Sequence, residues 1–188
     1  GVKVNDPLQP QRGGKATSSL LLAIENGHFE LAAALLKAGG DPNDQPAGYA
    51  ALHAISWVRK PIRGDGDPPP RGSGDLSSLD LVRDLVAHGA EVNLRLKKGD
   101  SGRGRFTTTG STPFLLAARN GDVPLMKLLL ELKADPSLPN ADNSPPLLAA
   151  AGVGALSDGD EAAATEEEAI EAVKLLLKLG ADVNAVDN

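Results

Sequence analysis

Histidines and clustered carboxylates are the side chains of this sequence best suited to catalysis or metal binding. The three histidines, His28, His53 and His88, lie far apart in the sequence, and none has partners at the spacing of a Ser-His-Asp triad or a metal motif. The carboxylates gather in SDGDEAAATEEE, residues 157–168. This run lacks the alternating oxygen ligands and the distant glutamate of an EF-hand loop. The sequence therefore predicts neither a catalytic triad nor a metal site.

The acidic run still leaves one enzymatic alternative open. Two carboxyl groups that face each other in a cleft, roughly 5–10 Å apart, would suit glycosidase-like hydrolysis. Carboxylates scattered over a solvated loop would only add charge: residues 153–168 carry a balance of −6. The arrangement of these side chains in space distinguishes the two interpretations.

A basic segment, residues 94–110, contrasts with the net charge of −6 of the whole chain. It holds five basic residues and one aspartate, a balance of +4. Its GDSGRGR stretch lacks the Gly-Lys-Ser/Thr ending of a phosphate-binding loop. Arg103, Arg105 and Phe106 combine electrostatic steering with one aromatic anchor, which predicts binding of an acidic partner. The acidic charge of the chain as a whole disfavours nucleic acid as a partner.

Composition predicts a folded domain. The chain has 188 residues, of which 41% are hydrophobic, enough for one domain with a buried core. Its apolar runs are far shorter than the roughly 18 residues of a membrane span, so no membrane partner is expected. The absence of cysteine excludes disulfides and thiolate sites without indicating a compartment.

Two blocks of sequence recur four times along the chain. The first block reads TSSLLLAIENG (17–27), YAALHAISWV (49–58), STPFLLAARNG (111–121) and NSPPLLAAAG (143–152). The second ends ALLKAGGDPN (34–43), DLVAHGAEVN (84–93), LLELKADPS (129–137) and LLLKLGADVN (175–184). Such self-similarity predicts a solenoid of stacked repeats, because one unit this small cannot bury its apolar faces alone.

Local signals predict that each block is a helix. Thr112 can cap the free backbone N–H groups of the first turn, and Pro113 fits the position that needs no N–H. Ser144 before Pro145 is a weaker version of the same start. The second blocks carry leucine-type residues at helical spacing, with capping boxes predicted at Thr165 with Glu168 and at Ser77 with Asp80. A glycine after the last turn, such as Gly89, ends the helix.

The quoted STPFLLAARNGDVPLMKLLLELKADPS, YAALHA and HGAEVN resemble ankyrin repeats, and the whole resembles an insertion-containing, bacterial-looking member of that family. The resemblance implies helix pairs joined by finger-like β-hairpin loops, and a structural role for His53 that ties adjacent loops together. The sequence departs from the family pattern at four places, where other residues replace the usual Thr-Pro, the helix-ending Gly, the loop Asn and the cap Thr: Ala50 with Ala51, Lys133, Ser137 and Pro145.

We therefore predict an all-α, ankyrin-type helical solenoid with long insertions in its loops, as a single domain over residues 1–188. GVKVN at the start resembles the end of a preceding repeat, and VDN at the end resembles the start of another finger, so we expect a piece of a longer array that could self-associate through its uncapped ends. The expected units are 1–16 (end of a preceding repeat and a long finger), 17–48, 49–110 with insertions, 111–142, and 143–188 with an insertion.

The expected function is non-catalytic binding of a protein or peptide, or scaffolding, through the concave surface and the finger loops. A passive spacer is an alternative beside the glycosidase-like hydrolase, and no cofactor is expected. Trp57 either packs the insertion at 59–75 or anchors a partner. The candidate partner-binding residues are Tyr49, Trp57, Arg103, Arg105, Phe106, Arg119, Asn120, Asp142 and Asn143.

Overall fold

The computed structural model describes residues 4–6, 16–60, 74–99, 106–152 and 164–187, in which it forms eight helices and no strand. The helices are α1 (Ser19–Glu25), α2 (Phe29–Lys37), α3 (Ala51–Arg59), α4 (Ser78–Ala87), α5 (Pro113–Arg119), α6 (Val123–Glu131), α7 (Pro146–Ala150) and α8 (Glu166–Lys178). The prediction of an all-α solenoid is confirmed.

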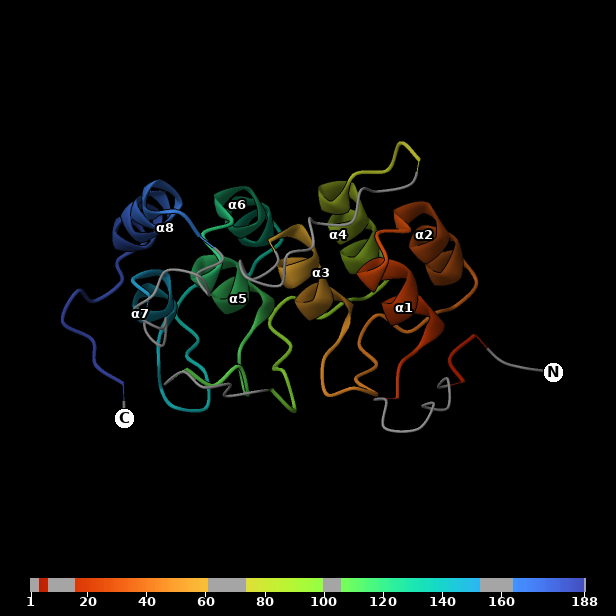
Figure 1. Cartoon of the computed structure of the whole chain (residues 1–188), viewed down its shortest axis with the longest axis horizontal. Coiled ribbons are helices and arrows are strands. Elements are labelled where there is room, and N and C mark those ends of the chain that lie inside the picture. Colours follow the sequence, from red (N-terminus) through yellow and green to blue (C-terminus); the bar gives the residue numbers. More distant parts are fainter. Residues whose placement is uncertain (1–3, 7–15, 61–73, 100–105, 153–163, 188) are drawn as a thin grey trace.

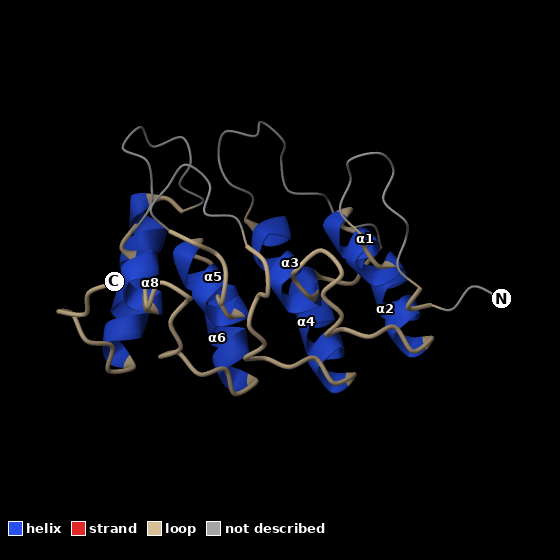
Figure 2. Cartoon of the chain, turned by 90° about the horizontal axis from the view of Figure 1, so that it is seen from below, coloured by secondary structure: helices blue, strands red, loops and turns tan. Residues whose placement is uncertain are grey.

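The helices form two layers, one from the first helix of each pair and one from the second. Helices α1, α3, α5 and α7 lie in one row, and α2, α4, α6 and α8 lie in the other (Figure 1). Each first helix contacts its own second helix and the first helix of the next pair. Seen from the finger side, the pairs follow one another along the long axis in sequence order (Figure 2). We call the side formed by the first helices the first-helix surface.

The core consists mainly of leucine and alanine. Alanines on the first helices let neighbouring helices approach closely, because they add little bulk at the contact. Leu81, Leu85 and Leu129 of the second helices are fully buried, and Phe114 of α5 is the largest of the fully buried side chains. Five alanines of the first helices are buried: Ala23, Ala117, Ala118, Ala149 and Ala150.

Most of the predicted helix starts are observed. The Thr112 hydroxyl accepts a hydrogen bond from the Leu115 N–H at 3.2 Å, and Pro113 occupies the first turn of α5. Thr165 and Glu168 form the capping box of α8. Ser77 caps α4 by accepting from the N–H of Asp80. The predicted capping box is not completed there, because the Asp80 carboxylate accepts from the Ser77 hydroxyl and not from the Ser77 N–H.

The start of α7 differs from the prediction. Pro145 is the residue before the first turn, and Ser144 lies one position too early to cap the helix. The Ser144 hydroxyl is buried without a hydrogen-bond partner in the described structure. Because no side chain caps its first turn, α7 lacks the roughly 1 kcal/mol that such a cap usually supplies.

The fingers bind one another through backbone hydrogen bonds. Within the finger after α4, the Leu96 N–H donates to the Ser111 carbonyl at 3.0 Å, and the Gly110 N–H donates to the Leu96 carbonyl at 2.8 Å. The Lys97 N–H donates to the Gly48 carbonyl of the preceding finger at 2.8 Å. These bonds fix the spacing of the fingers below the first-helix surface.

Lys133 ends α6 in the left-handed conformation, with φ 73°, where the other repeats use glycine. A side chain in this conformation costs roughly 1–2 kcal/mol. We therefore expect Lys133→Gly to raise the free energy of unfolding by about 1 kcal/mol in urea denaturation followed by circular dichroism. The matched control is Gly89→Lys: a Cβ at Gly89, φ 93°, meets no atom within 4 Å, so only the backbone cost is introduced. Destabilisation by Lys133→Gly would contradict this explanation.

Candidate functional site

The first-helix surface carries an aromatic pair between α1 and α3. Tyr49 and Trp57 are the only tyrosine and the only tryptophan of the sequence, and both are half-buried. Their rings meet edge to face, with centroids 4.9 Å apart and an interplanar angle of 84°. Both side chains pack against the main core while keeping one side accessible. Edge-to-face pairs of this kind favour a defined orientation of both rings.

The Tyr49 hydroxyl donates a hydrogen bond to the carboxylate of Glu25, at the end of α1. Burial raises the pKa of Tyr49, and the hydrogen bond to Glu25 and the charge of that carboxylate raise it further. The hydroxyl therefore stays protonated and remains a donor over the whole physiological pH range. This bond fixes the phenol ring across the junction between the first and second helix pairs.

His53 holds the start of α3 against the next finger. Its Nδ1 accepts from the Ala50 N–H at 3.1 Å, and its Nε2 lies 2.9 Å from the Leu94 carbonyl, to which it donates. The ring thereby binds the backbone N–H of Ala50, as the third helical residue does in a capping box, whereas Ala50 has no side chain that could cap the first turn of α3. Burial lowers the pKa of His53 to about 4, although hydrogen bonds to backbone groups act in the opposite direction. His53 is fully buried and neutral at pH 7, in a structural position.

Phe106 and Arg119, predicted separately, lie together. The Phe106 ring is buried, with 3% exposed, in a small cluster with Leu115 of α5 and Ala149 of α7. The Arg119 guanidinium covers this ring, 4.8 Å from its centroid. The prediction that Phe106 is an exposed anchor is wrong, because the finger folds back and buries the ring under the first-helix surface. Arg119 is the half-buried member of the pair.

Asn120 is also misassigned by the sequence analysis. It is buried, and its Nδ2 donates to the Ser56 carbonyl of α3 at 3.1 Å, which joins the end of α5 to the preceding repeat. Asp142 and Asn143 lie in the turn of the finger before α7, where Asn143 is exposed with φ 61°. The centre of that turn is Asn140, which the sequence analysis missed: its Oδ1 accepts from the Asp142 N–H at 3.0 Å.

A largely buried ion pair lies at the C-terminal end of α3, the end away from the fingers. Arg59 of α3 binds Asp122 through two bonds, Nε to Oδ2 at 2.7 Å and Nη2 to Oδ1 at 3.0 Å. Asp122 is 1% exposed and also caps α6 by accepting from the Leu125 N–H at 3.1 Å. The remaining Arg59 nitrogen, Nη1, donates to the Ser78 hydroxyl of α4 at 2.5 Å. An aspartate just before a helical run indicates a helix cap in the sequence. Its ion-pair partner, Arg59, lies 63 positions earlier, so no local pattern predicts the ion pair.

The structure describes only parts of the two charged insertions, residues 94–110 and 153–168. Arg103, Arg105 and the acidic residues up to 163 lie outside the described residues. At the described end of the acidic insertion, Glu166 and Glu167 are exposed on the first turn of α8. Glu168 pairs with Lys60 and closes the Thr165 cap.

Two further findings concern the described part of the chain. No group of three or more His, Asp or Glu side chains gathers there as a set of metal ligands. No helix in the same residues has the length and apolar character required to cross a bilayer.

Stacked helix pairs linked by hydrogen-bonded fingers are the arrangement of a repeat solenoid, and the comparison of the sequence with protein families agrees. The model for ankyrin repeats, in three copies, matches residues 74–187. The chain belongs to the ankyrin repeat family. Helices α1 to α3 precede the start of that match and continue the same two-layer arrangement. Ankyrin repeats generally mediate protein–protein interactions, which supports a non-catalytic binding module. A comparison with curated proteins gave no match.

Proposed function

We propose that the chain binds a protein or peptide segment on its first-helix surface, at the Tyr49–Trp57 pair. The single observation that supports this most is the placement of both aromatic side chains half-buried beside α1 instead of inside the core. Large amphipathic rings in such positions are enriched among the residues that dominate the energy of protein interfaces. Leu22, about one helical turn before Glu25 on α1, is 42% exposed.

The pair is organised before a partner arrives. The Tyr49 ring is held by Glu25 at one end and by Trp57 at its edge, so little side-chain freedom remains to be lost on binding. Immobilising a flexible side chain at an interface costs roughly 0.5–1.5 kcal/mol, and fixed side chains avoid most of that cost. The Glu25 carboxylate also adds a negative group beside the Tyr49 hydroxyl.

The proposal is tested by selecting phage-displayed peptides on the wild-type chain and measuring their affinity for purified variants. We expect Trp57→Ala to weaken the selected peptides at least tenfold, since truncating an interface anchor costs about 2 kcal/mol or more. Tyr49→Phe is the matched control: it keeps the ring pair, loses only the bond to Glu25, and should change affinity less than threefold. Thermal melts of both variants report whether the fold persists.

Selected peptides that bind Trp57→Ala as tightly as the wild type, on a variant with a native-like melt, would reject the proposal. The basic finger remains a second candidate. In the described part of this finger, Lys97 and Lys98 are exposed. The contribution of Arg103 and Arg105 to an acidic partner stays a prediction from charge alone.

A further inference from the structure

In three successive fingers, an asparagine hydrogen-bonds to the backbone at the helix end of the next repeat. In the first such contact, the Asn5 Nδ2 donates to the Gly39 carbonyl at 3.0 Å, and its Oδ1 accepts from the Asp41 N–H at 2.8 Å. One carboxamide thus satisfies one backbone acceptor and one backbone donor that lie two residues apart. We call this series of contacts the asparagine ladder.

The next two repeats continue the ladder. The Asn43 side chain donates to the Gly89 carbonyl at 2.8 Å and accepts from the Glu91 N–H at 2.8 Å. The Asn93 Oδ1 accepts from the Asp135 N–H at 2.9 Å. In three successive repeats, the carboxamide oxygen of the asparagine therefore accepts from the equivalent backbone N–H of the next repeat. In two of them, the carboxamide nitrogen also donates to the equivalent backbone carbonyl.

The ladder stops at Ser137, which occupies the position of the next asparagine. Its hydroxyl donates to Asp135 of its own loop at 2.6 Å, so it does not reach across to the following repeat. The equivalent backbone groups there are the carbonyl of Gly180 and the N–H of Asp182. Within the described residues, neither group has a hydrogen-bond partner. This repeat alone keeps the donor and the acceptor but lacks the carboxamide.

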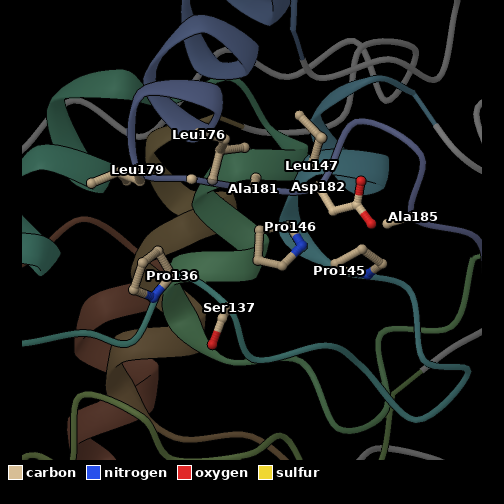
Figure 3. Close-up of a pocket in the computed structure, with 11 residues that line it drawn as sticks. Pro136, Ser137, Pro145, Pro146, Leu147, Leu176, Leu179, Ala181, Asp182 and Ala185 are labelled. Atoms are coloured by element: carbon tan, nitrogen blue, oxygen red, sulfur yellow. The ribbon is translucent and has the colours of Figure 1, made fainter.

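A pocket of about 210 Å³ lies where the carboxamide is missing. Ser137, Gly180 and Asp182 line it, and Figure 3 shows the Ser137 hydroxyl turned away from the Ala181–Asp182 segment. The volume is below the roughly 300–1,000 Å³ of sites for drug-sized ligands, and it suits a single side chain. Its apolar walls come from Pro136, Pro145, Pro146, Leu147, Leu176 and Leu179.

We propose that this pocket binds a partner peptide that presents an asparagine-type carboxamide next to an aliphatic side chain. The carboxamide takes the place of the missing ladder asparagine: its oxygen accepts from the Asp182 N–H, and its nitrogen donates to the Gly180 carbonyl. The aliphatic side chain fills the space between the prolines and leucines. The site shares no residue with the Tyr49–Trp57 pair, so it is independent of the function proposed above.

The chemistry of the pocket selects a neutral donor–acceptor group. A carboxylate could accept from the Asp182 N–H, but it could not donate to the Gly180 carbonyl, and the Asp182 side chain would repel it. An ammonium group could donate but not accept. Only a group with both functions, side by side in one plane, repeats the contacts that Asn5 and Asn43 make inside the chain.

The test follows the backbone N–H resonance of Asp182 in ¹⁵N–¹H spectra during titration with the methyl ester of N-acetyl-asparaginyl-leucine, whose only primary carboxamide is the asparagine side chain. The matched probe is the methyl ester of N-acetyl-aspartyl-leucine, which differs only by a carboxylate in place of that carboxamide. We expect a saturable shift with the first peptide and at least tenfold weaker binding of the second. Equal binding of the two peptides, or no shift of the Asp182 resonance, would overturn the proposal.

Variants of Ser137 complete the test. Ser137→Asn supplies the ladder carboxamide from within the chain, and should weaken the peptide at least tenfold while raising the melting temperature. Ser137→Ala leaves the pocket open and should bind the peptide like the wild type. If Ser137→Asn does not fold, Ala185→Phe, which narrows the pocket from its other side, should weaken binding in its place. Unchanged binding by the folded blocking variant, or a shift that depends on protein concentration without peptide, would refute a peptide occupant.

Discussion

Replacing Asp122 by alanine is expected to lower the free energy of unfolding by about 3–5 kcal/mol. The substitution leaves the largely buried guanidinium of Arg59, 17% exposed, without its carboxylate, and a buried charge that has lost its partner is strongly destabilising. It also removes the cap on the Leu125 N–H, which contributes roughly 1 kcal/mol. Because Asp122 joins α6 to α3, we expect urea unfolding to lose cooperativity between the second and third helix pairs as well.

An exposed ion pair of the same fold is the matched control. Arg83 and Glu131 lie 3.2 Å apart with side chains that are 54% and 62% exposed. Glu131→Ala should change the free energy of unfolding by less than about 1 kcal/mol, because solvent screens such pairs. Asp122→Asn keeps an acceptor for the cap and should fall between the two. Equal effects of Asp122→Ala and Glu131→Ala on the free energy of unfolding would show that the buried ion pair does not stabilise the contact between repeats.

The second large effect is a loss of stability in mild acid that comes from His53. The folded chain resists protonation of His53 until about pH 4, whereas the unfolded chain takes up the proton near pH 6.5. Between pH 4 and 6.5 the unfolded chain therefore binds more protons than the folded chain, so a fall in pH favours unfolding. The contribution of His53 to the free energy of unfolding has its full value above pH 6.5 and falls as the pH drops toward 4, by up to ~3.5 kcal/mol, at about 1.4 kcal/mol for each pH unit.

His53→Gln separates this effect from the titration of carboxylates. Glutamine has one acceptor and one donor, so it can replace the bonds to Ala50 and Leu94, but it carries no charge at any pH. The variant should be less stable than the wild type at pH 7, and the difference should shrink as the pH falls to 4. The measurement is urea denaturation at several pH values. A difference that stays constant over this range would contradict a titrating, buried His53.

The repeat architecture could be predicted from the sequence because its signals are local. Helical spacing of leucines, the Thr112 and Thr165 caps and the glycines after the second helices all act within one or two turns, so a reader of the sequence sees both partners of each interaction. Lys133 and Ser137 could likewise be recognised as departures, because three other copies of the same loop show what usually stands there. The copies within one chain can therefore be compared with each other.

The candidate site depended on contacts that no local pattern encodes. Phe106 looked like an exposed anchor in a charged loop, yet the finger places it against Leu115 and Ala149, from two different helices. Asn120 donates to a carbonyl 64 positions earlier, in the preceding repeat. Whether such side chains face solvent is decided by how neighbouring repeats stack. The sequence by itself determined the repeated helix pairs, whose interactions are short-range; only the tertiary structure decided which polar and aromatic side chains the stacking buries, because that burial is shared between repeats.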